Sequence, residues 1–208
     1  MTKIKICGLT LPKEAGLLTA PEIAMAGMVM FVPKSHRNIS PERAEEIRSA
    51  LPQGVKAVAV MIAPTPEQAK RAAATGVDYL QIHGEIAPEV LRQSSIPILK
   101  AFNIKDLGEY ERYRQEEKIA GFVFDAGTPG SGQTFDWSIL ERIERDEKLF
   151  LLAGGLHAGN VEEAVRRFTP DLVDVSSGVE RSKQEGYGKD PDKIEAFAEA
   201  VRKANVNI

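Results

Sequence analysis

The sequence has only one cysteine, Cys7, among its 208 residues. A single cysteine excludes an intrachain disulfide and any metal site built from several thiolates, and it is typical of a reducing compartment. No apolar run approaches the ~20 residues of a membrane helix, and the first residues, MTKIKICGLT, become polar too early for a secretory signal. We therefore expect a cytoplasmic protein that has no membrane partner.

The chain also lacks an excess of positive charge. Its formal net charge is −3 and its isoelectric point is near 5.8, which argues against broad binding to a nucleic-acid backbone. No glycine–serine linker, low-complexity tract or composition shift separates one part of the chain from another. We expect a single domain over residues 1–208 and, since no long amphipathic extension stands out, a monomer.

Short apolar runs recur along the chain with helical segments between them. Most are rich in Val, Ile, Leu or Phe and nearly continuous in hydrophobicity, as strands covered on both faces should be. We expect eight strands, at 3–7, 27–32, 56–62, 79–83, 97–102, 121–125, 149–154 and 172–177. Eight strands joined by crossovers predict the α/β class and a single (βα)8 barrel, or TIM barrel. A doubly wound open sheet is the alternative, because counting strands cannot show closure.

The segments between these runs carry the marks of helix starts. Ser40 and Asp190 each precede a proline, and Thr65 begins a capping-box pattern. Two charge-dense stretches, 109–118 and 141–148, could form an interaction surface. We interpret both as solvated helix faces, which is the usual role of such patterns.

Polar and small residues stand where most of the expected strands end. In a (βα)8 barrel, chemistry gathers at the carboxyl ends of the strands and in the loops that follow them. Here those ends carry Cys7, the segment 34–37, His83, Asp125, the pair Gly154-Gly155 and the triplet 176–178. The sequence therefore predicts a reaction centre at the mouth of the barrel.

Cys7 and Asp125 are the candidates for proton transfer. A lone cysteine is usually a small buried residue, but a thiolate beside a glycine turn can accept a proton from carbon if amides or cations lower its pKa. Asp125 ends the core-like run GFVF, and partial burial would raise its pKa enough for a general acid. Asp136 is the competing carboxylate, although its position before Trp137 at an expected helix start favours an N-cap.

Anionic groups of a substrate have candidate partners at three strand ends. Gly154-Gly155 and Ser177-Gly178 follow the seventh and eighth strands, where barrels commonly bind phosphate. Glycines let backbone amides approach an anion closely. Arg37, in the loop after the second strand, can pair with a substrate carboxylate through two hydrogen bonds.

The chain has three histidines. His83 is either a residue of the pocket or a satisfied core histidine, and we expect His36 and His157 at the surface or the rim. The sequence contains no His-x-x-x-His pair or carboxylate–histidine cluster. It therefore supports no metal site.

Six collinear segments carry a resemblance to a known family. They are KIKICGLT, PKSHRNISPE, LQIHG, GSGQTFDW, LLAGGL followed by NV, and DVSSGVE. In this order they resemble the signature segments of the N-(5′-phosphoribosyl)anthranilate isomerases. The resemblance implies a (βα)8-barrel enzyme of tryptophan biosynthesis that works without a metal or cofactor on a small phosphorylated substrate. Its reaction is an Amadori rearrangement of an aminoaldose to an aminoketose.

The resemblance also implies roles for individual residues. Cys7 falls on the family's general base, Asp125 on its general acid, and Arg37 on the arginine that meets the anthranilate carboxylate. The phosphate-binding segments fall on Gly154, Gly155, Ser177 and Gly178. His83 and Asp174 match positions that line the pocket.

The sequence departs from the family pattern around the second strand and after Asp125. Residues 28–32 read MVMFV, and only four residues separate Asp125 from Gly130.

Two alternatives to the isomerase function require different residues at the strand ends. A phosphosugar isomerase of the histidine pathway has aspartates at the ends of the first strand and of a middle strand. The cysteine at position 7, where the first strand ends, argues against it. A barrel that binds phosphate without catalysis is disfavoured because both proton-transfer residues are present.

Overall fold

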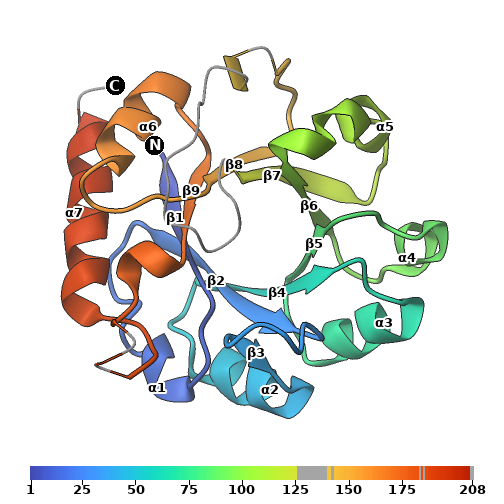
Figure 1. The fold of residues 1–208 in the computed structure, drawn as a ribbon, viewed down its shortest axis with the longest axis horizontal. Coiled ribbons are helices and arrows are strands. Elements are labelled where there is room, and N and C mark those ends of the chain that lie inside the picture. Colours follow the sequence, from blue (N-terminus) through green and yellow to red (C-terminus); the bar gives the residue numbers. More distant parts are fainter. Residues whose placement is uncertain (126–139, 142, 183, 185, 207–208) are drawn as a thin grey trace.

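The computed structural model of the chain describes residues 1–125, 140–141, 143–182, 184 and 186–206. Within these residues, eight parallel strands form a ring with helices on its outside (Figure 1). The strands are β1 (Lys3–Cys7), β2 (Ile23–Met30), β4 (Lys56–Ile62), β5 (Tyr79–His83), β6 (Ile98–Asn103), β7 (Ile119–Asp125), β8 (Leu149–Ala153) and β9 (Leu172–Val175). A two-residue strand, β3 (Asn38–Ile39), pairs with β2 at its end.

The ring closes through β1. This strand pairs with β2 on one side and with β9 on the other, in parallel on both. The remaining strands pair with their neighbours in chain order from β2 through β4 to β9. Closure confirms the predicted (βα)8 barrel and excludes the open sheet.

The helices lie between successive strands and cover the outer face of the ring (Figure 1). They are α1 (Pro12–Ala15), α2 (Pro41–Ala50), α3 (Pro66–Ala74), α4 (Pro88–Gln93), α5 (Tyr110–Arg114), α6 (Val161–Phe168) and α7 (Pro191–Val206), with 3-10 turns η1 (Ile104–Glu109) and η3 (Ser177–Val179). In the part of the chain that the structure describes, none of them is long and apolar enough to cross a membrane. The GSGQTFDW segment, Asp136 and the short segment after Asp125 lie outside the described residues.

The expected caps begin three of these helices. The Ser40 hydroxyl accepts a hydrogen bond from the backbone N–H of Arg43, 3.3 Å away. Thr65 and Gln68 form a reciprocal capping box, with bonds of 2.9 and 3.2 Å. The carboxylate of Asp190 accepts bonds from two amides of the first turn of α7. These side chains satisfy amides that have no partner inside the helix.

The second strand lies earlier than the sequence predicts. It spans Ile23–Met30 instead of 27–32, whereas the other strand boundaries agree within two residues. The small residues of its first half, Ala24 and Ala26, hide its start from a search for apolar runs. Phe31 ends it, because its backbone φ of 59° is in the left-handed region and cannot continue a strand. Met28 and Met30 are fully buried on the helix side, whereas Val29, Phe31 and Val32 are partly buried.

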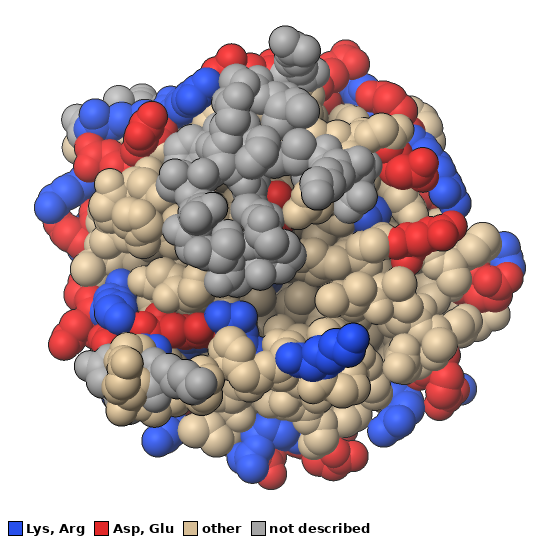
Figure 2. Space-filling model, in the orientation of Figure 1, with Lys and Arg blue, Asp and Glu red and all other residues tan. Residues whose placement is uncertain are grey.

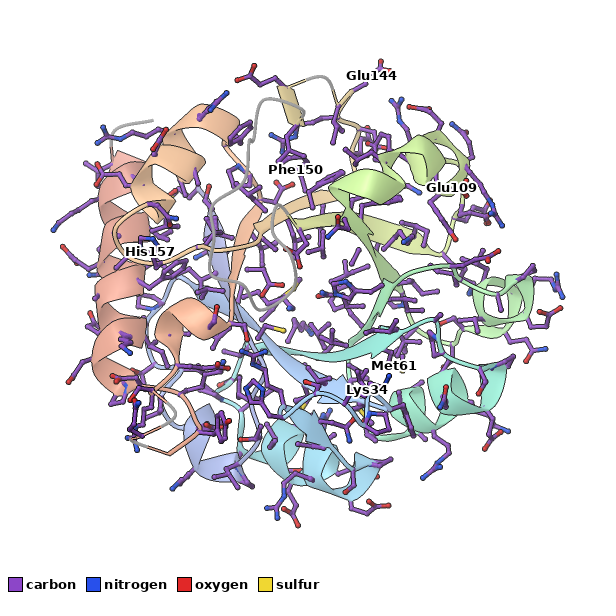
Figure 3. All side chains as sticks on the ribbon, in the orientation of Figure 1. Lys34, Met61, Glu109, Glu144, Phe150 and His157 are labelled. Carbon is purple, nitrogen blue, oxygen red and sulfur yellow. The ribbon has the colours of Figure 1, made fainter. Side chains whose placement is uncertain are left out.

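The helix expected at 141–148 does not extend over residues 143–148. Residues 143–148 follow an irregular path, and the Tyr110 hydroxyl donates a hydrogen bond to the Glu144 carbonyl, 3.0 Å away. Glu109 and Glu144 lie at the outer margin of the molecule (Figure 3), where their side chains are 57% and 78% exposed. The charged stretches are therefore solvated, but only part of the first is helical.

Two apolar clusters fill the fold because successive side chains of a strand point to opposite faces. In β1, Ile4 and Ile6 are fully buried in the cluster between strands and helices. Lys5 and Cys7 alternate with them and face the barrel interior. The interior cluster consists of Met25, Val58, Val60, Leu99, Ala101, Val123, Leu151, Ala153 and Leu172. Polar groups of the strands therefore meet inside the barrel above an apolar base.

Charged side chains are mixed in sign on the molecular surface. Lys and Arg alternate with Asp and Glu around the margin of the face in Figure 2. This agrees with the small net charge of the sequence, −3. Among the described residues of this face, Lys and Arg form no broad basic field of the kind that binds nucleic acid.

Gly121 in β7 provides a test of interior packing. A Cβ at this position would lie 2.6 Å from the Leu149 Cβ and 2.8 Å from the Leu149 carbonyl oxygen. We expect Gly121→Ala to lower the free energy of unfolding by about 1–3 kcal/mol in urea titrations, as overpacking does. Gly108→Ala is the matched control, since a Cβ there meets nothing within 4 Å. Equal stability of the two variants would contradict the tight approach of β7 to β8.

Candidate active site

A pocket of about 110 Å³ opens at the carboxyl ends of the barrel strands. Every residue that the sequence predicts for the site lines this pocket, except Gly178. Ser176, from the triplet 176–178 at the expected end of the last strand, also lines it, and its wall further contains residues outside that prediction: Val60, Gln81, Val123, Ala153 and Leu156. These residues share one pocket because the closed ring of parallel strands brings the carboxyl ends of all strands to the same end of the barrel.

Cys7 and Asp125 enter the pocket from different parts of the ring. Cys7 ends β1 and Asp125 ends β7, with β8 and β9 between these two strands. Both side chains are partly buried. A thiol and a carboxyl group therefore face one cavity from separate walls, as a base and an acid acting on the same small molecule require.

Lys5 and Asp174 form a buried ion pair beneath the pocket. The Lys5 ammonium is fully buried and lies 2.7 Å from Asp174 Oδ2, on the neighbouring strand β9. Asp174 lines the pocket, as the sequence predicts, whereas Lys5 was missed. The alternation along β1 could have identified it, because Lys5 must share the inward face of Cys7.

Burial raises the pKa of the Cys7 thiol above its ordinary value, while the nearby Lys5 charge acts in the opposite direction. Lys5 itself stays protonated. Burial lowers its pKa, but the attraction of Asp174 and Cys7 outweighs this, and the result is a raised pKa. The floor of the pocket therefore holds a permanent positive charge.

Arg37 reaches the pocket already engaged with Glu180. Its Nε and Nη2 donate to the two carboxylate oxygens of Glu180 over 2.6 and 2.7 Å. The buried Lys189 ammonium donates to the same carboxylate over 2.8 Å. Burial alone would raise the pKa of Glu180, but its bonds with Arg37 and Lys189 lower it to about 2. The bidentate partner of Arg37 is therefore a side chain of the protein, which the sequence did not predict.

His36 lies at the rim, as expected. Its ring stacks on that of Tyr187 with 4.7 Å between centroids, and its side chain is 41% exposed. His157 is also exposed and lies on the loop between β8 and α6, outside the ring of strands (Figure 3). Neither histidine lines the pocket.

The loop after β8 is shaped by two glycines with left-handed backbone. Gly154 and Gly155 have φ angles of 95° and 63°, which other residues rarely adopt. The Asn160 side chain donates to the Gly155 carbonyl over 3.0 Å and accepts from the amide of His157 over 2.8 Å. These two hydrogen bonds of the Asn160 side chain hold the loop in the shape that presents Gly154 and Gly155 to the pocket.

Gly178 allows the loop after β9 to pack closely against the loop after β8. A Cβ at Gly178 would lie 2.1 Å from the carbonyl oxygen of Leu156, so only glycine allows this approach. Ser177 lines the pocket beside Gly154 and Gly155, while Gly178 itself does not. The structure thus gives Gly178 a packing role that positions the phosphate-binding candidates around it.

His83 lies in the pocket wall beside Gln81. The Nε2 atoms of the two side chains are 3.1 Å apart. Burial, followed by the charges of Lys5 and Lys100, lowers the pKa of His83 to about 4. His83 is therefore a neutral hydrogen-bonding group near pH 7, not an acid.

Two buried side-chain acceptor oxygens have no hydrogen-bond partner within the described part of the chain. They are Gln81 Oε1 and Asp174 Oδ1, and both belong to side chains that line the pocket. Unpaired buried acceptors are costly, so they suit a ligand that brings hydroxyl or amine donors. Among the described residues, no group of three or more His, Cys, Asp and Glu side chains could hold a metal ion.

Proteins of known name match nearly the whole chain. The sequence profile described as N-(5'phosphoribosyl)anthranilate (PRA) isomerase matches residues 4–200. The N-(5'-phosphoribosyl)anthranilate isomerase of Streptococcus mutans serotype c is 40% identical over 205 residues, which are 98% of this chain and 100% of that protein.

Solved structures agree. The phosphoribosyl anthranilate isomerase of Thermotoga maritima is 34% identical with a TM-score of 0.80, over 98% of this chain and 100% of that one. A phosphoribosyl anthranilate isomerase in complex with reduced 1-(o-carboxyphenylamino)-1-deoxyribulose 5-phosphate is 32% identical with a TM-score of 0.78, again over 98% and 100%.

The lowered pKa of His83 predicts a specific loss of stability in mild acid. Because the pKa is about 4 in the folded protein and near 6.5 in the unfolded chain, the unfolded chain binds this proton more strongly. Stability therefore falls as the pH drops below 6.5, by about 2 kcal/mol between pH 7 and pH 5. His83→Asn should remove this part of the loss, as measured by urea unfolding at both pH values.

Glu180 does not interfere in this window. Its pKa is lowered to about 2, so the stability that it contributes is lost only as the pH falls below 4.5. An identical loss between pH 7 and pH 5 in the parent and in His83→Asn would contradict a neutral, buried His83.

Proposed function

The chain belongs to the N-(5′-phosphoribosyl)anthranilate isomerase family, and from this premise we propose how its residues carry out the family's reaction. The reaction converts N-(5′-phosphoribosyl)anthranilate to 1-(2-carboxyphenylamino)-1-deoxyribulose 5-phosphate in tryptophan biosynthesis. The observation that carries the proposal is the presence of Cys7 and Asp125 at the ends of two barrel strands, on the wall of one pocket. This pair supplies the base and the acid that an Amadori rearrangement needs.

Asp125 acts first, as the general acid. Its carboxyl group gives a proton to the ring oxygen of the ribose, the C1′–O bond breaks, and the opened sugar forms a Schiff base with the anthranilate nitrogen. Cys7 acts second, as the general base. Its thiolate takes the proton from C2′, and the resulting enolamine tautomerises to the ketone. Each such proton transfer contributes about 10²–10⁴-fold to the rate.

The two anionic ends of the substrate fix the ribose between acid and base. The phosphate lies against the loops of Gly154, Gly155 and Ser177, where left-handed glycines let backbone amides approach an anion. The anthranilate carboxylate lies near Arg37, whose guanidinium is held in place by Glu180. Holding both ends of the substrate places the ribose in a fixed orientation relative to the acid and the base, so that the two proton transfers need no further encounter.

Donors on the sugar and the amine match the unpaired acceptors of the pocket. Asp174 Oδ1 and Gln81 Oε1 accept hydrogen bonds from ribose hydroxyls or from the anthranilate N–H. Neutral His83 completes this wall without adding charge. A single domain over residues 1–208, a monomeric state and a cytoplasmic location remain predictions from the sequence.

The experiment that tests the function is a coupled assay with purified protein, phosphoribosylanthranilate and the next enzyme of the pathway. Turnover is expected. A folded protein that binds the substrate without converting it would support instead a phosphate-binding barrel that has lost catalysis.

Cys7→Ser should fold normally and lose about 10²-fold or more in kcat, because a serine hydroxyl is a much poorer base than a thiolate. The coupled assay measures kcat, and urea unfolding measures stability. A variant that loses mainly stability would show that Cys7 is a buried apolar residue with no part in proton transfer.

Asp125→Asn should abolish ring opening, with kcat lower by about 10²–10⁴-fold, and should still bind inorganic phosphate. Asp136→Asn is the matched control. The sequence predicts Asp136 as an N-cap, asparagine is as good an N-cap as aspartate, and this variant should retain most activity. Binding is measured by calorimetry and turnover by the coupled assay. The reverse pattern, with Asp136→Asn inactive and Asp125→Asn active, would assign the acid to Asp136.

A further inference from the structure

Lys5 is a buried cation that the reaction scheme does not use. Its side chain is 0% exposed, on the inward face of β1. Burying a charge is costly unless it is well paired, and an apolar pair of similar size is often as stable or more so. Apolar residues do occupy neighbouring inward positions, such as Met25 and Leu172. Packing alone therefore gives no reason for a lysine at this place.

The position of Lys5 relative to Cys7 gives such a reason. The two residues are two positions apart on β1, so both point into the barrel. A Cβ on Gly27, in the adjacent strand, would lie 2.8 Å from Cys7 Sγ and 3.0 Å from Lys5 Nζ. Both atoms therefore lie beside the same point above Gly27, and the Lys5 charge lowers the pKa of the Cys7 thiol against the effect of burial. Gly27 provides the space in which thiol and ammonium meet.

Asp174 fixes the other side of the ammonium group. Its Oδ2 accepts the 2.7 Å bond from Lys5 Nζ, which orients the charge between the carboxylate and the sulfur. Asp174 Oδ1 remains without a partner among the described residues and lines the pocket. Asp174 on β9 thus holds the Lys5 ammonium group, while the charge of that group acts on Cys7 at the end of β1.

Other charged and titratable groups surround the thiol. Lys189 lowers the pKa of Cys7 and Asp174 raises it, each with less effect than Lys5. Arg37 lies within electrostatic range of the thiol, and His83 and Asp125 line the same pocket from β5 and β7. Arg37 and Lys189 are both bonded to Glu180, whereas Lys5 shares the inward face of β1 with Cys7 and lies with it beside Gly27. Lys5 is the cation whose geometry is specific to Cys7.

We propose that Lys5 is a positioning residue for the proposed base: its ammonium group, held by Asp174, stabilises the Cys7 thiolate and fixes the sulfur beside the pocket without touching the substrate. The thiol releases its proton to solvent before the reaction. In the reaction the thiolate takes the C2′ proton, and Lys5 keeps its three protons throughout. The proposal rests on the proposed function in one respect only, the role of Cys7 as base.

The test measures the thiol and the reaction separately. Cys7 is the only cysteine in the chain, so alkylation by iodoacetamide over a pH series reports its thiolate fraction directly. In Lys5→Met we expect the alkylation rate near pH 7.5 to fall about tenfold or more, which corresponds to one unit of thiol pKa. The rising limb of kcat/KM should move to higher pH, kcat should fall by a similar factor, and KM should change little.

Two further variants keep the test sharp. Lys3→Met, at an exposed position of the same strand, is the matched control and should leave the alkylation profile unchanged. Lys5→Met leaves Asp174 buried without its partner, which destabilises the fold, so the double variant Lys5→Met/Asp174→Asn removes both charges together. The double variant should also show a slower alkylation than the parent.

The outcomes separate the two claims. An unchanged alkylation profile in a folded Lys5 variant would overturn the positioning role and leave a structural ion pair. A shifted profile with unchanged kcat would support the effect of Lys5 on the thiol and overturn Cys7 as the base. A shifted profile with a matching loss of kcat supports both.

Discussion

The pairing of β1 with both β2 and β9 is the constraint on which the site depends. It closes the sheet, and closure turns the carboxyl ends of strands far apart in the sequence towards one mouth. The same pairing sets Lys5 beside Asp174 and Cys7 beside Gly27. A slip of one residue in β1 would turn these groups outwards and bring Ile4 and Ile6 into the barrel. Burial of the two isoleucines on the helix side therefore fixes the register that points Lys5 and Cys7 into the barrel.

Much of this arrangement was readable in the sequence, because it depends on local patterns. Apolar runs located the strands, and a polar residue at the end of such a run, as at Cys7 and Asp125, identified the mouth. What could not be predicted depends on partners distant in the chain. Arg37 meets Glu180 across 143 positions, and the irregular segment 143–148 is bonded to the Tyr110 hydroxyl through the Glu144 carbonyl, a contact that no local charge pattern contains.

The site balances its charges in pairs. Lys5 lies against Asp174, while Arg37 and Lys189 share Glu180. In each case a cation near the pocket is anchored by a carboxylate behind or beside it, which limits the cost of burial and leaves the cation's direction well defined. Preorganised charges of this kind need no rearrangement when a doubly anionic ligand enters, and they therefore stabilise charge that shifts during a reaction better than mobile side chains do.

Gly27 illustrates a consequence for the mutational tolerance of the barrel. Its φ is not in the left-handed region, and replacing such a glycine by alanine usually stabilises a protein by restricting the unfolded chain. At this position the added methyl group would occupy the space shared by the Cys7 sulfur and the Lys5 ammonium. A stabilisation campaign guided only by backbone geometry would select this glycine and disturb the proposed reaction centre, because the absence of a side chain is what makes room for the sulfur and the ammonium group.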